Sequence, residues 1–320
     1  MNEPTYEGDF TLDEPFKLES GEILPSIKQR FTIYGNLNER RDNAVLVFHA
    51  LTGSARIHEW WRDVVGKSLN RNDVCLICAN HIGSCYGSTS SSEIQTLITA
   101  KDVVNAQIEL LQHLRIEKLY AAIGGSVGGM LALQLAVDFP NLAEKIIAIG
   151  ACELPAMSLA LNHLQREALK IENGVSLARK IAMITYKSAE FFDARHARKS
   201  NRNGENPRDN VVSRYDVAGY LDYQGESFVK RFDVQTYNLI SKMMDLFELS
   251  DDDISKIKSQ ICLIGISSDW LFPLSDVRKL SERLKTNLID TTFIEMNSID
   301  GHDAFLTDTN LMNEILSDTL

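Results

Sequence analysis

The stretch Ile123–Met130, which reads IGGSVGGM, decides how this chain is organised. It contains the pattern G-x-S-x-G centred on Ser126, with an apolar run (LYAAIG) before it and an apolar, helix-forming run (MLALQLAVDF) after it. A strand that turns this sharply into a helix strains the serine, and small neighbours are needed to avoid clashes. The hydroxyl then projects above the sheet near the positive end of the helix. This context favours Ser126 as a nucleophile over the alternative, a serine that only caps a helix.

Six short apolar runs bounded by turn residues indicate strands buried on both faces, as in a parallel sheet. They are Ala44–His49, Val74–Ala79, Leu119–Gly124, Lys145–Gly150, Ile261–Ile266 and Thr291–Met296. Helical patterns lie between them, over Thr99–Leu114, Met130–Asp138 and Leu274–Leu284. The alternation predicts an α/β fold with a mostly parallel sheet and helices on both faces.

The alternation stops between Leu154 and Asp253, where the sequence is rich in charge and helix formers. Within this stretch Lys199–Asp209 (KSNRNGENPRD) indicates a surface loop, and the acidic Ser250–Asp253 indicates a solvated helix start. We therefore predict a helical lid insertion over residues 154–253, with residues 1–153 and 254–320 forming the core. Such an insertion would cover the carboxyl ends of the strands, where open α/β sheets bind ligands.

Composition narrows the class of protein. The net charge of −11 over 320 residues makes nucleic acid and membrane surfaces poor partners. We expect a cytoplasmic protein, because the N-terminus lacks a secretory signal, no run is long enough to span a membrane, and the five cysteines are scattered. Cys75 and Cys78 lie on a predicted strand, where residues three apart face opposite sides, so we expect two core residues and no metal site.

A serine hydroxyl is a weak nucleophile that needs a base, and the base is held by a third group. In folds with this strand-turn-helix serine the partners follow in the order serine, acid, histidine, each after a later strand. Asp269 follows the run Ile261–Ile266, and His302 follows Thr291–Met296. We therefore predict an α/β-hydrolase fold with Ser126, Asp269 and His302 as the catalytic triad. The alternatives are a helix cap for Asp269 and a surface histidine for His302.

The turn after the first central strand supplies one backbone N–H of the oxyanion hole in this fold. His49 ends that strand, and we assign it to shaping the turn. The expected oxyanion donors are the N–H groups of Leu51 and Val127. His81 is expected to be a loop residue near the site.

Several further segments fit one family when taken together. They are FHALTGS (48–54), HEWW (58–61), CYGST (85–89), GGSVGGM (124–130), ITYKS (184–188), GYLDYQGESFVKRFDVQTY (219–237), SSDWLFP (267–273) and GHDAFL (301–306). With them the chain resembles the homoserine O-acyltransferase family, which catalyses the first committed step toward methionine in many bacteria and fungi. The resemblance extends from about residue 20 to the end. It departs at NHIGS (80–84) and VAGYL (217–221), which fall on the roof and rim of the site.

The resemblance implies acetyl-CoA as a co-substrate, no bound cofactor, and an amino acid whose hydroxyl accepts the acyl group. It implies that Asp303 and Tyr220 contact the amino and carboxylate ends of the acceptor, with Arg214 as a second candidate for the carboxylate. A buried zwitterion needs one anion and one cation or hydrogen-bond donor, which this set provides. The oligomeric state stays open, with a homodimer among the alternatives.

The resulting hypothesis is a homoserine O-acetyltransferase that works through an acyl-serine by a ping-pong route. One alternative keeps the chemistry with another acceptor or donor, such as serine or succinyl-CoA. Another is a serine hydrolase or esterase, in which water replaces the acceptor, and the degree of water exclusion separates it from a transferase. A non-catalytic binding protein is disfavoured, because all three members of the predicted triad are present.

Overall fold

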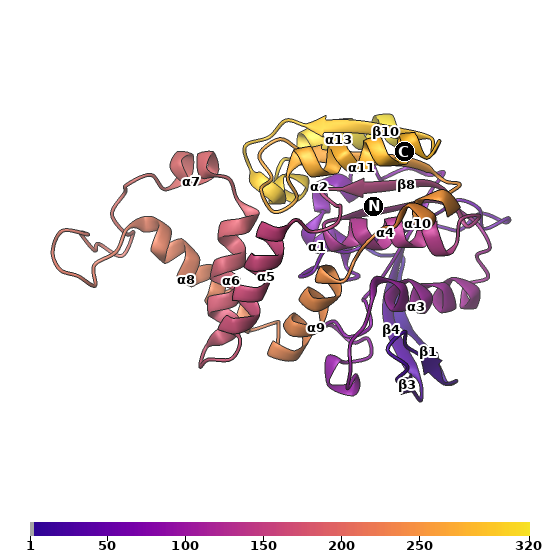
Figure 1. The fold of residues 1–320 in the computed structure, drawn as a ribbon, viewed down its shortest axis with the longest axis horizontal. Helices are drawn as coiled ribbons and strands as arrows, with labels where there is room; N and C mark the ends of the chain where they lie inside the picture. The colour runs from indigo at the N-terminus through magenta and orange to yellow at the C-terminus, as the bar shows by residue number, and fades with distance from the viewer. Residues whose placement is uncertain (1–2) are drawn as a thin grey trace.

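Eight strands form a single mixed sheet in the order β1-β4-β6-β5-β7-β8-β9-β10. The computed structural model describes residues 3–320 (Figure 1). The strands are β1 (Tyr6–Leu12), β4 (Ile27–Tyr34), β5 (Ala44–Phe48), β6 (Cys75–Ala79), β7 (Leu119–Gly125), β8 (Ala143–Ile149), β9 (Gln260–Ile266) and β10 (Thr291–Met296). All pairs from β6 to β10 are parallel, whereas β4 pairs antiparallel with both β1 and β6. A separate hairpin joins β2 (Phe16–Lys17) to β3 (Ile23–Leu24).

The six predicted strands are all confirmed, with ends shifted by at most two residues. The expected burial on both faces is wrong for β10, which lies at the edge of the sheet and is largely half-exposed. Every residue of β5 and β6 is buried, as expected for strands covered on both faces. Cys75 packs in one core cluster and Cys78 in the other, so the two cysteines do face opposite sides of the sheet. Both are free thiols in the interior.

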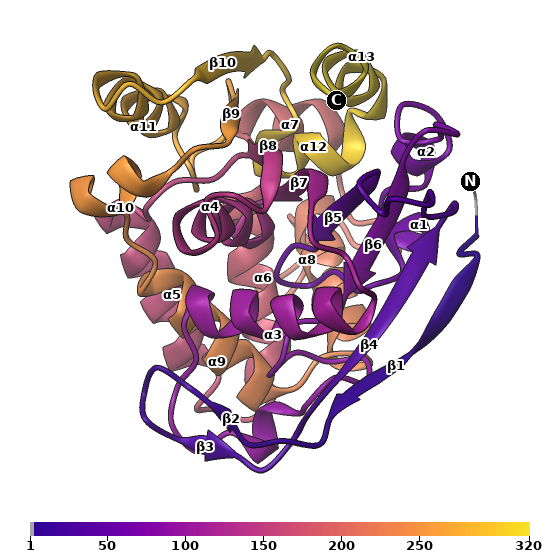
Figure 2. The ribbon, with the colours of Figure 1, turned by 90° about the vertical axis from the view of Figure 1, so that its right-hand side faces the viewer.

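Helices cover both faces of the sheet (Figure 2). One face carries α3 (Ala100–His113), α4 (Val127–Asp138), α10 (Asp251–Lys256) and α11 (Leu274–Thr286). The other carries α1 (Ile57–Trp60), α2 (Arg62–Val65), α12 (Ala304–Thr307) and α13 (Thr309–Thr319). The α/β fold predicted from the alternation of strands and helices, a mostly parallel sheet with helices on both faces, is confirmed.

Helix starts follow the capping chemistry of the sequence. Thr99 caps α3: its hydroxyl accepts from the backbone N–H of Asp102, whose carboxylate accepts from the backbone N–H of Thr99. Ser250 and Asp253 form the same reciprocal pair at α10. Helix α4 starts at Val127, earlier than the predicted Met130, because Gly128 and Gly129 already belong to the helix.

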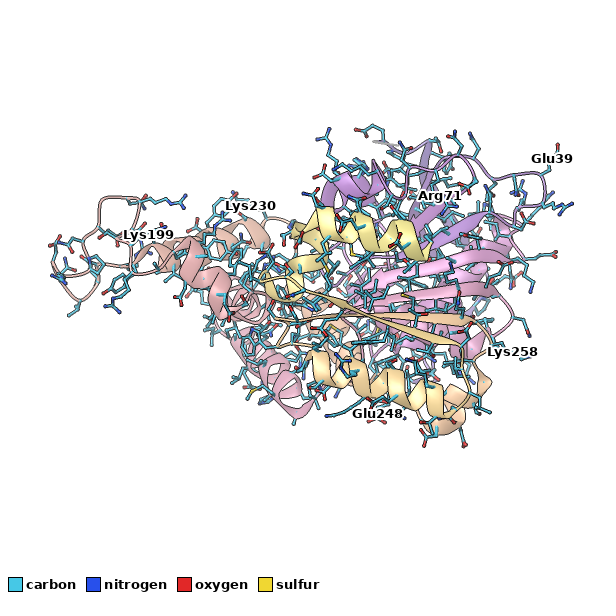
Figure 3. The ribbon with its side chains drawn as sticks, turned by 90° about the horizontal axis from the view of Figure 1, so that it is seen from above. Glu39, Arg71, Lys199, Lys230, Glu248 and Lys258 are labelled. Carbon is cyan, nitrogen blue, oxygen red and sulfur yellow. The ribbon has the colours of Figure 1, made fainter. Side chains whose placement is uncertain are left out.

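Between β8 and β9 the chain forms a helical insertion of α5 (Ala156–Ala168), α6 (Gly174–Tyr186), α7 (Ala189–Arg195), α8 (Asp216–Val229) and α9 (Val234–Asp245). In Figure 3 Lys258, which shortly precedes β9, lies at the end of the sheet opposite Lys199 and Lys230 of the insertion. The insertion therefore faces the carboxyl ends of the parallel strands. The α7–α8 connection (196–215) projects as an arm and contains the predicted surface loop. We propose that the chain divides into a lid insertion, residues 154–253, and a core formed by residues 1–153 and 254–320.

No helix within residues 3–320 has both the length and the apolar character that crossing a membrane would require.

We predict that Gly128→Ala destabilises the fold by about 1–3 kcal/mol, the usual cost of overpacking a filled interior. A Cβ atom at Gly128 would lie 2.2 Å from the carbonyl oxygen of Phe48, which belongs to a central strand and cannot yield easily. Urea unfolding followed by circular dichroism measures the change. The control is Gly219→Ala in α8, where the nearest atom belongs to the side chain of Asn201 at 3.0 Å. This change should be neutral or stabilising, since alanine favours helix. Equal losses of stability in both variants would contradict the claim that Gly128 packs too closely on Phe48 to accept a side chain.

Candidate active site

Ser126 lies at the turn between β7 and α4 with φ 59° and ψ −129°, a conformation that non-glycine residues rarely adopt. Its backbone N–H donates to the carbonyl of Ile149 at 2.8 Å, which fixes the turn against β8. A Cβ atom at Gly124 would lie 2.2 Å from the backbone of Gly128, so the two arms of the turn almost touch. The strained serine is held by close backbone packing on both sides, as expected of a nucleophile elbow.

Asp269 and His302 meet at the ends of β9 and β10. The Nδ1–H of His302 donates to Oδ2 of Asp269 at 2.6 Å, and both side chains are almost completely buried. Oδ1 of Asp269 accepts from the backbone N–H groups of Leu271 and Phe272, at 2.8 and 2.9 Å. The carboxylate therefore caps a turn with one oxygen and orients the imidazole with the other. Nε2 of His302 has no hydrogen-bond partner among residues 3–320.

The serine and the acid–histidine pair lie at the same edge of the sheet. The backbone N–H of Ser126 donates to the carbonyl of Ile149, and Gly150 is the next residue along the chain. A Cβ atom at Gly150 would lie 3.3 Å from Asp269 and 3.4 Å from His302. The ring of Phe305 packs on the imidazole of His302 at 5.7 Å and against the backbone just before Ser126. The structure thus brings the three residues of the predicted triad together.

The pKa of His302 is raised above its usual value, because the neighbouring groups that raise it outweigh those that lower it. Burial disfavours the imidazolium, but the charge and hydrogen bond of Asp269 outweigh it, and Asp303 adds to the increase. Lys187 acts in the opposite direction. A base must start neutral, so the balance of these charges decides the pH above which His302 can take a proton.

Two backbone N–H groups at the same edge of the sheet lack acceptors. Among residues 3–320 neither the N–H of Leu51 nor that of Val127 makes a hydrogen bond to the protein. Val127 opens α4 next to Ser126, and Leu51 lies in the turn after β5. These are the two groups predicted to form the oxyanion hole, and both remain free to bind a developing negative charge.

His49 and His81 stack at 3.7 Å in the interior beneath that turn. The Nδ1–H of His49 donates to the carbonyl of Ala50 at 2.8 Å, and its Nε2 accepts from the backbone N–H of His81 at 3.3 Å. Burial lowers the pKa of His49 to about 4 and holds the pKa of His81 well below its usual value. Both imidazoles thus remain neutral at physiological pH and fix the turn, in agreement with the role expected for His49.

Asp303 forms an ion pair that the sequence did not indicate. Its Oδ2 lies 3.1 Å from Nζ of Lys187, whose side chain is only 5% exposed. Lys187 follows α6 in the insertion, and a Cβ atom at Gly301 would lie 2.7 Å from its backbone. This close approach brings a buried cation next to the loop of His302. An isolated lysine in ITYKS carries no local signal for such a contact.

Arg179 is a second residue that sequence analysis missed. Its guanidinium stacks on Tyr186 at 5.5 Å and on Phe228 at 4.9 Å, and its buried Nε has no partner among residues 3–320. Tyr186 in turn packs on the imidazole of His302 at 5.9 Å. The sequence did offer one signal for Arg179. It lies three and four residues before Ala182 and Met183, so it falls on the same, buried face of α6.

Tyr220 and Arg214 line a cavity of about 580 Å³ at the base of the arm, and no residue of the predicted triad lines this cavity. Asp303 and Arg179 are close enough to influence the pKa of Tyr220, which burial raises. Arg214 is paired with the carboxylates of Glu205, at 2.8 Å, and of Asp222. The guanidinium of Arg214 is thus already neutralised within the insertion and its arm, whereas Arg179 forms no ion pair with any carboxylate in the described part of the chain, residues 3–320.

The geometry agrees with comparisons to known proteins. A family model for the alpha/beta hydrolase fold matches residues 43–308. Homoserine O-acetyltransferase of Methanobrevibacter ruminantium is 35% identical over 97% of this chain and 72% of the relative. Homoserine O-succinyltransferase of Alkalilimnicola ehrlichii is 34% identical over 92% of this chain and 89% of the relative.

The chain belongs to the homoserine O-acyltransferase family of α/β hydrolases. The resemblance stated from its motifs is thereby confirmed. A crystal structure of homoserine O-acetyltransferase from Staphylococcus aureus superposes with a TM-score of 0.80 at 26% identity, covering 98% of this chain and 94% of that one. The relatives of this acyltransferase carry either acetyl or succinyl in their names, so family membership does not fix the acyl group.

We predict that Lys187→Gln moves the acidic limb of the pH–rate profile to higher pH. Loss of the ammonium removes the charge that lowers the pKa of His302 and leaves Asp303, which raises it, unbalanced. The base then becomes neutral only at higher pH. The measurement is the pH dependence of thiol release from an acyl-CoA before any acceptor is added. Lys187→Arg keeps the charge and should keep the wild-type limb. An unshifted limb in Lys187→Gln would refute the proposed electrostatic role.

Proposed function

We propose that this enzyme transfers the acetyl group of acetyl-CoA to the hydroxyl of homoserine through an acyl-Ser126 intermediate. The observation that carries the proposal is the placement of opposite charges around one base. Asp303 directly follows His302, and Arg179 stacks on the tyrosine that packs on His302. An amino-acid zwitterion bound between an anion and a cation at these positions would present its side-chain hydroxyl to the imidazole.

In the first half-reaction Nε2 of His302 accepts the proton of the Ser126 hydroxyl as the oxygen attacks the thioester carbonyl. The N–H groups of Leu51 and Val127 stabilise the resulting oxyanion, each contributing about 3 kcal/mol in comparable sites. Collapse of the tetrahedral intermediate breaks the carbon–sulfur bond. The proton held by His302 passes to the CoA thiolate, which leaves as the thiol.

In the second half-reaction His302 accepts the proton of the acceptor hydroxyl as that oxygen attacks the acyl-serine carbonyl. The same two N–H groups stabilise the second oxyanion. His302 then returns the proton to the oxygen of Ser126, which restores the free enzyme and releases the O-acyl amino acid. One base thus serves both steps, and Asp269 holds its tautomer throughout.

Binding of the acceptor follows from the buried charges. The ammonium of homoserine would share the carboxylate of Asp303 with Lys187, and its carboxylate would receive the guanidinium of Arg179. Tyr220 remains our candidate for orienting the far end of the acceptor. We give Arg179 preference over Arg214, because two carboxylates already neutralise Arg214.

The surroundings of His302 favour acetyl over succinyl. The rings of Tyr186, Phe272 and Phe305 pack around the imidazole, and Ser126 is 5% exposed. An acetyl methyl group suits such apolar walls, whereas the second carboxylate of a succinyl group would need a cation there. The two nearby cations, Lys187 and Arg179, are already assigned to Asp303 and to the acceptor.

The test is thiol release with acetyl-CoA or succinyl-CoA, each with homoserine, serine or no acceptor. We expect a burst with acetyl-CoA alone and fast steady release only when homoserine is added. Above the acidic limb of the pH–rate profile, Asp303→Asn should retain the burst and lose most of the steady rate with homoserine, because it removes the proposed partner of the acceptor's ammonium and leaves the predicted triad in place. Ser126→Ala is the control that should abolish both.

Four results would each decide against part of this proposal. Equal loss of burst and steady rate in Asp303→Asn would assign Asp303 to support of the base. Faster release with succinyl-CoA would replace the donor, and faster release with serine would replace the acceptor. Steady thiol release that ignores every amino acid would make the enzyme a hydrolase.

A further inference from the structure

A second buried aspartate–histidine pair lies in the insertion, where the arm leaves α7 and returns to α8. The Nδ1–H of His196 donates to Oδ2 of Asp216 at 2.7 Å, and both side chains are buried. The hydrogen bond joins the same atoms as the bond between His302 and Asp269 at the edge of the sheet. The proposed reaction does not use the His196–Asp216 pair, so its presence in the insertion needs another explanation.

The backbone at the base of the arm holds this pair together. His196 follows α7, and Asp216 opens α8. The N–H of Lys199 donates to the carbonyl of His196 at 3.2 Å, and the N–H of Asp216 donates to the carbonyl of Lys199 at 2.9 Å. These two bonds close the base of the arm, so the imidazole of His196 is fixed against the first turn of α8.

The imidazole of His196 packs on aromatic rings. Its centroid lies 4.9 Å from that of Tyr220 and 6.1 Å from that of Phe192. Nε2 of His196 is buried and has no hydrogen-bond partner among residues 3–320. A buried polar atom without a partner costs free energy, so packing alone would favour an apolar ring at this position. What the imidazole adds is the hydrogen bond to Asp216, which fixes the plane of the ring on which Tyr220 packs.

Tyr220 connects this pair to the proposed acceptor site. It follows Asp216 by one turn of α8, and Asp303 and Arg179 are close enough to influence the pKa of its phenol. Its hydroxyl makes no hydrogen bond within residues 3–320, which leaves the group free to bind a substrate. Tyr220 also borders the cavity of about 580 Å³ at the base of the arm, so part of its ring has no packing partner. The direction of the phenol therefore depends on the ring of His196.

We propose that His196, held by Asp216, is a positioning residue that directs the phenol of Tyr220 toward the amino-acid acceptor. This inference rests on the proposed function, which makes Tyr220 a contact of the acceptor. The carboxylate fixes the plane of the imidazole, and the imidazole fixes the phenol that packs on it. Within residues 3–320 neither member of the pair forms a hydrogen bond or ring contact with the predicted triad, so acylation of Ser126 should not depend on them.

The first test separates the ring of His196 from its hydrogen bond. His196→Asn removes the ring but keeps an N–H donor for Asp216, and it should raise the KM for homoserine about tenfold, the usual scale for one misplaced hydrogen bond. The burst of thiol release with acetyl-CoA alone should keep its wild-type size. Asp216→Asn keeps the ring and an oxygen that accepts the Nδ1–H, so its KM should stay close to that of wild type. His163→Asn is the matched control, because His163 is an exposed histidine of α5 in the same insertion.

A double-mutant cycle tests whether His196 acts through Tyr220. If it does, His196→Asn should add nothing to the KM that Tyr220→Ala has already raised, because both changes then remove one interaction. In protein labelled with fluorotyrosine, the fluorine resonance that disappears in Tyr220→Phe identifies Tyr220. This resonance should shift in His196→Asn and stay in place in His163→Asn. The shift reports the contact between the two rings without any substrate.

The outcomes separate this inference from the proposed function. An unchanged KM in His196→Asn, or additive effects in the cycle, would overturn the positioning role while leaving acyl transfer intact. Parallel losses of burst, turnover and melting temperature would make the pair a support of the fold and would overturn the role as well. If wild type ignored homoserine, the proposed function would fail. The fluorine resonance would then decide alone, and an unmoved resonance in His196→Asn would count against the positioning of Tyr220.

Discussion

The close approach of α4 to the end of β5 is the constraint on which the rest of the site depends. Gly128 lies so near the carbonyl of Phe48 that no side chain fits between them. This contact sets the start of α4, and with it the N–H of Val127, beside the turn that carries the N–H of Leu51. It also forces Ser126 into its strained conformation, because the chain has no room for a wider turn.

The charged groups around His302 are the second constraint on the site. Asp269 orients the imidazole and is satisfied by two backbone N–H groups, so it needs no cation. Asp303 lies one residue away and is balanced by Lys187 from the insertion. The core therefore supplies the base and its orienting acid, while the insertion supplies the charge that keeps a second carboxylate from raising the pKa of the base further. This division couples the insertion to the chemistry without placing one of its residues in the proposed triad.

The sequence was sufficient for features that depend on local pattern and chain order. The six strands from β5 to β10, the nucleophile elbow, and the position of Asp269 and His302 after the last two strands could all be predicted from apolar runs and turn residues. β1 and β4 could not, because β1 is largely exposed and β4 carries the buried polar side chains of Gln29 and Thr32. Lys187 and Arg179 were missed for another reason. Their partners lie on elements distant in sequence, and only the folding of the insertion over the sheet brings them to His302.

The most direct measurement of the central claim is the fate of an acyl group on Ser126. The enzyme is mixed with acetyl-CoA, the peptide that contains Ser126 is weighed by mass spectrometry, and the sample is then divided between homoserine and buffer. The account predicts one acetyl group on that peptide, lost rapidly with homoserine to give O-acetylhomoserine and slowly in buffer. An unmodified Ser126 under these conditions, or equally fast loss of the acetyl group in buffer, would contradict it.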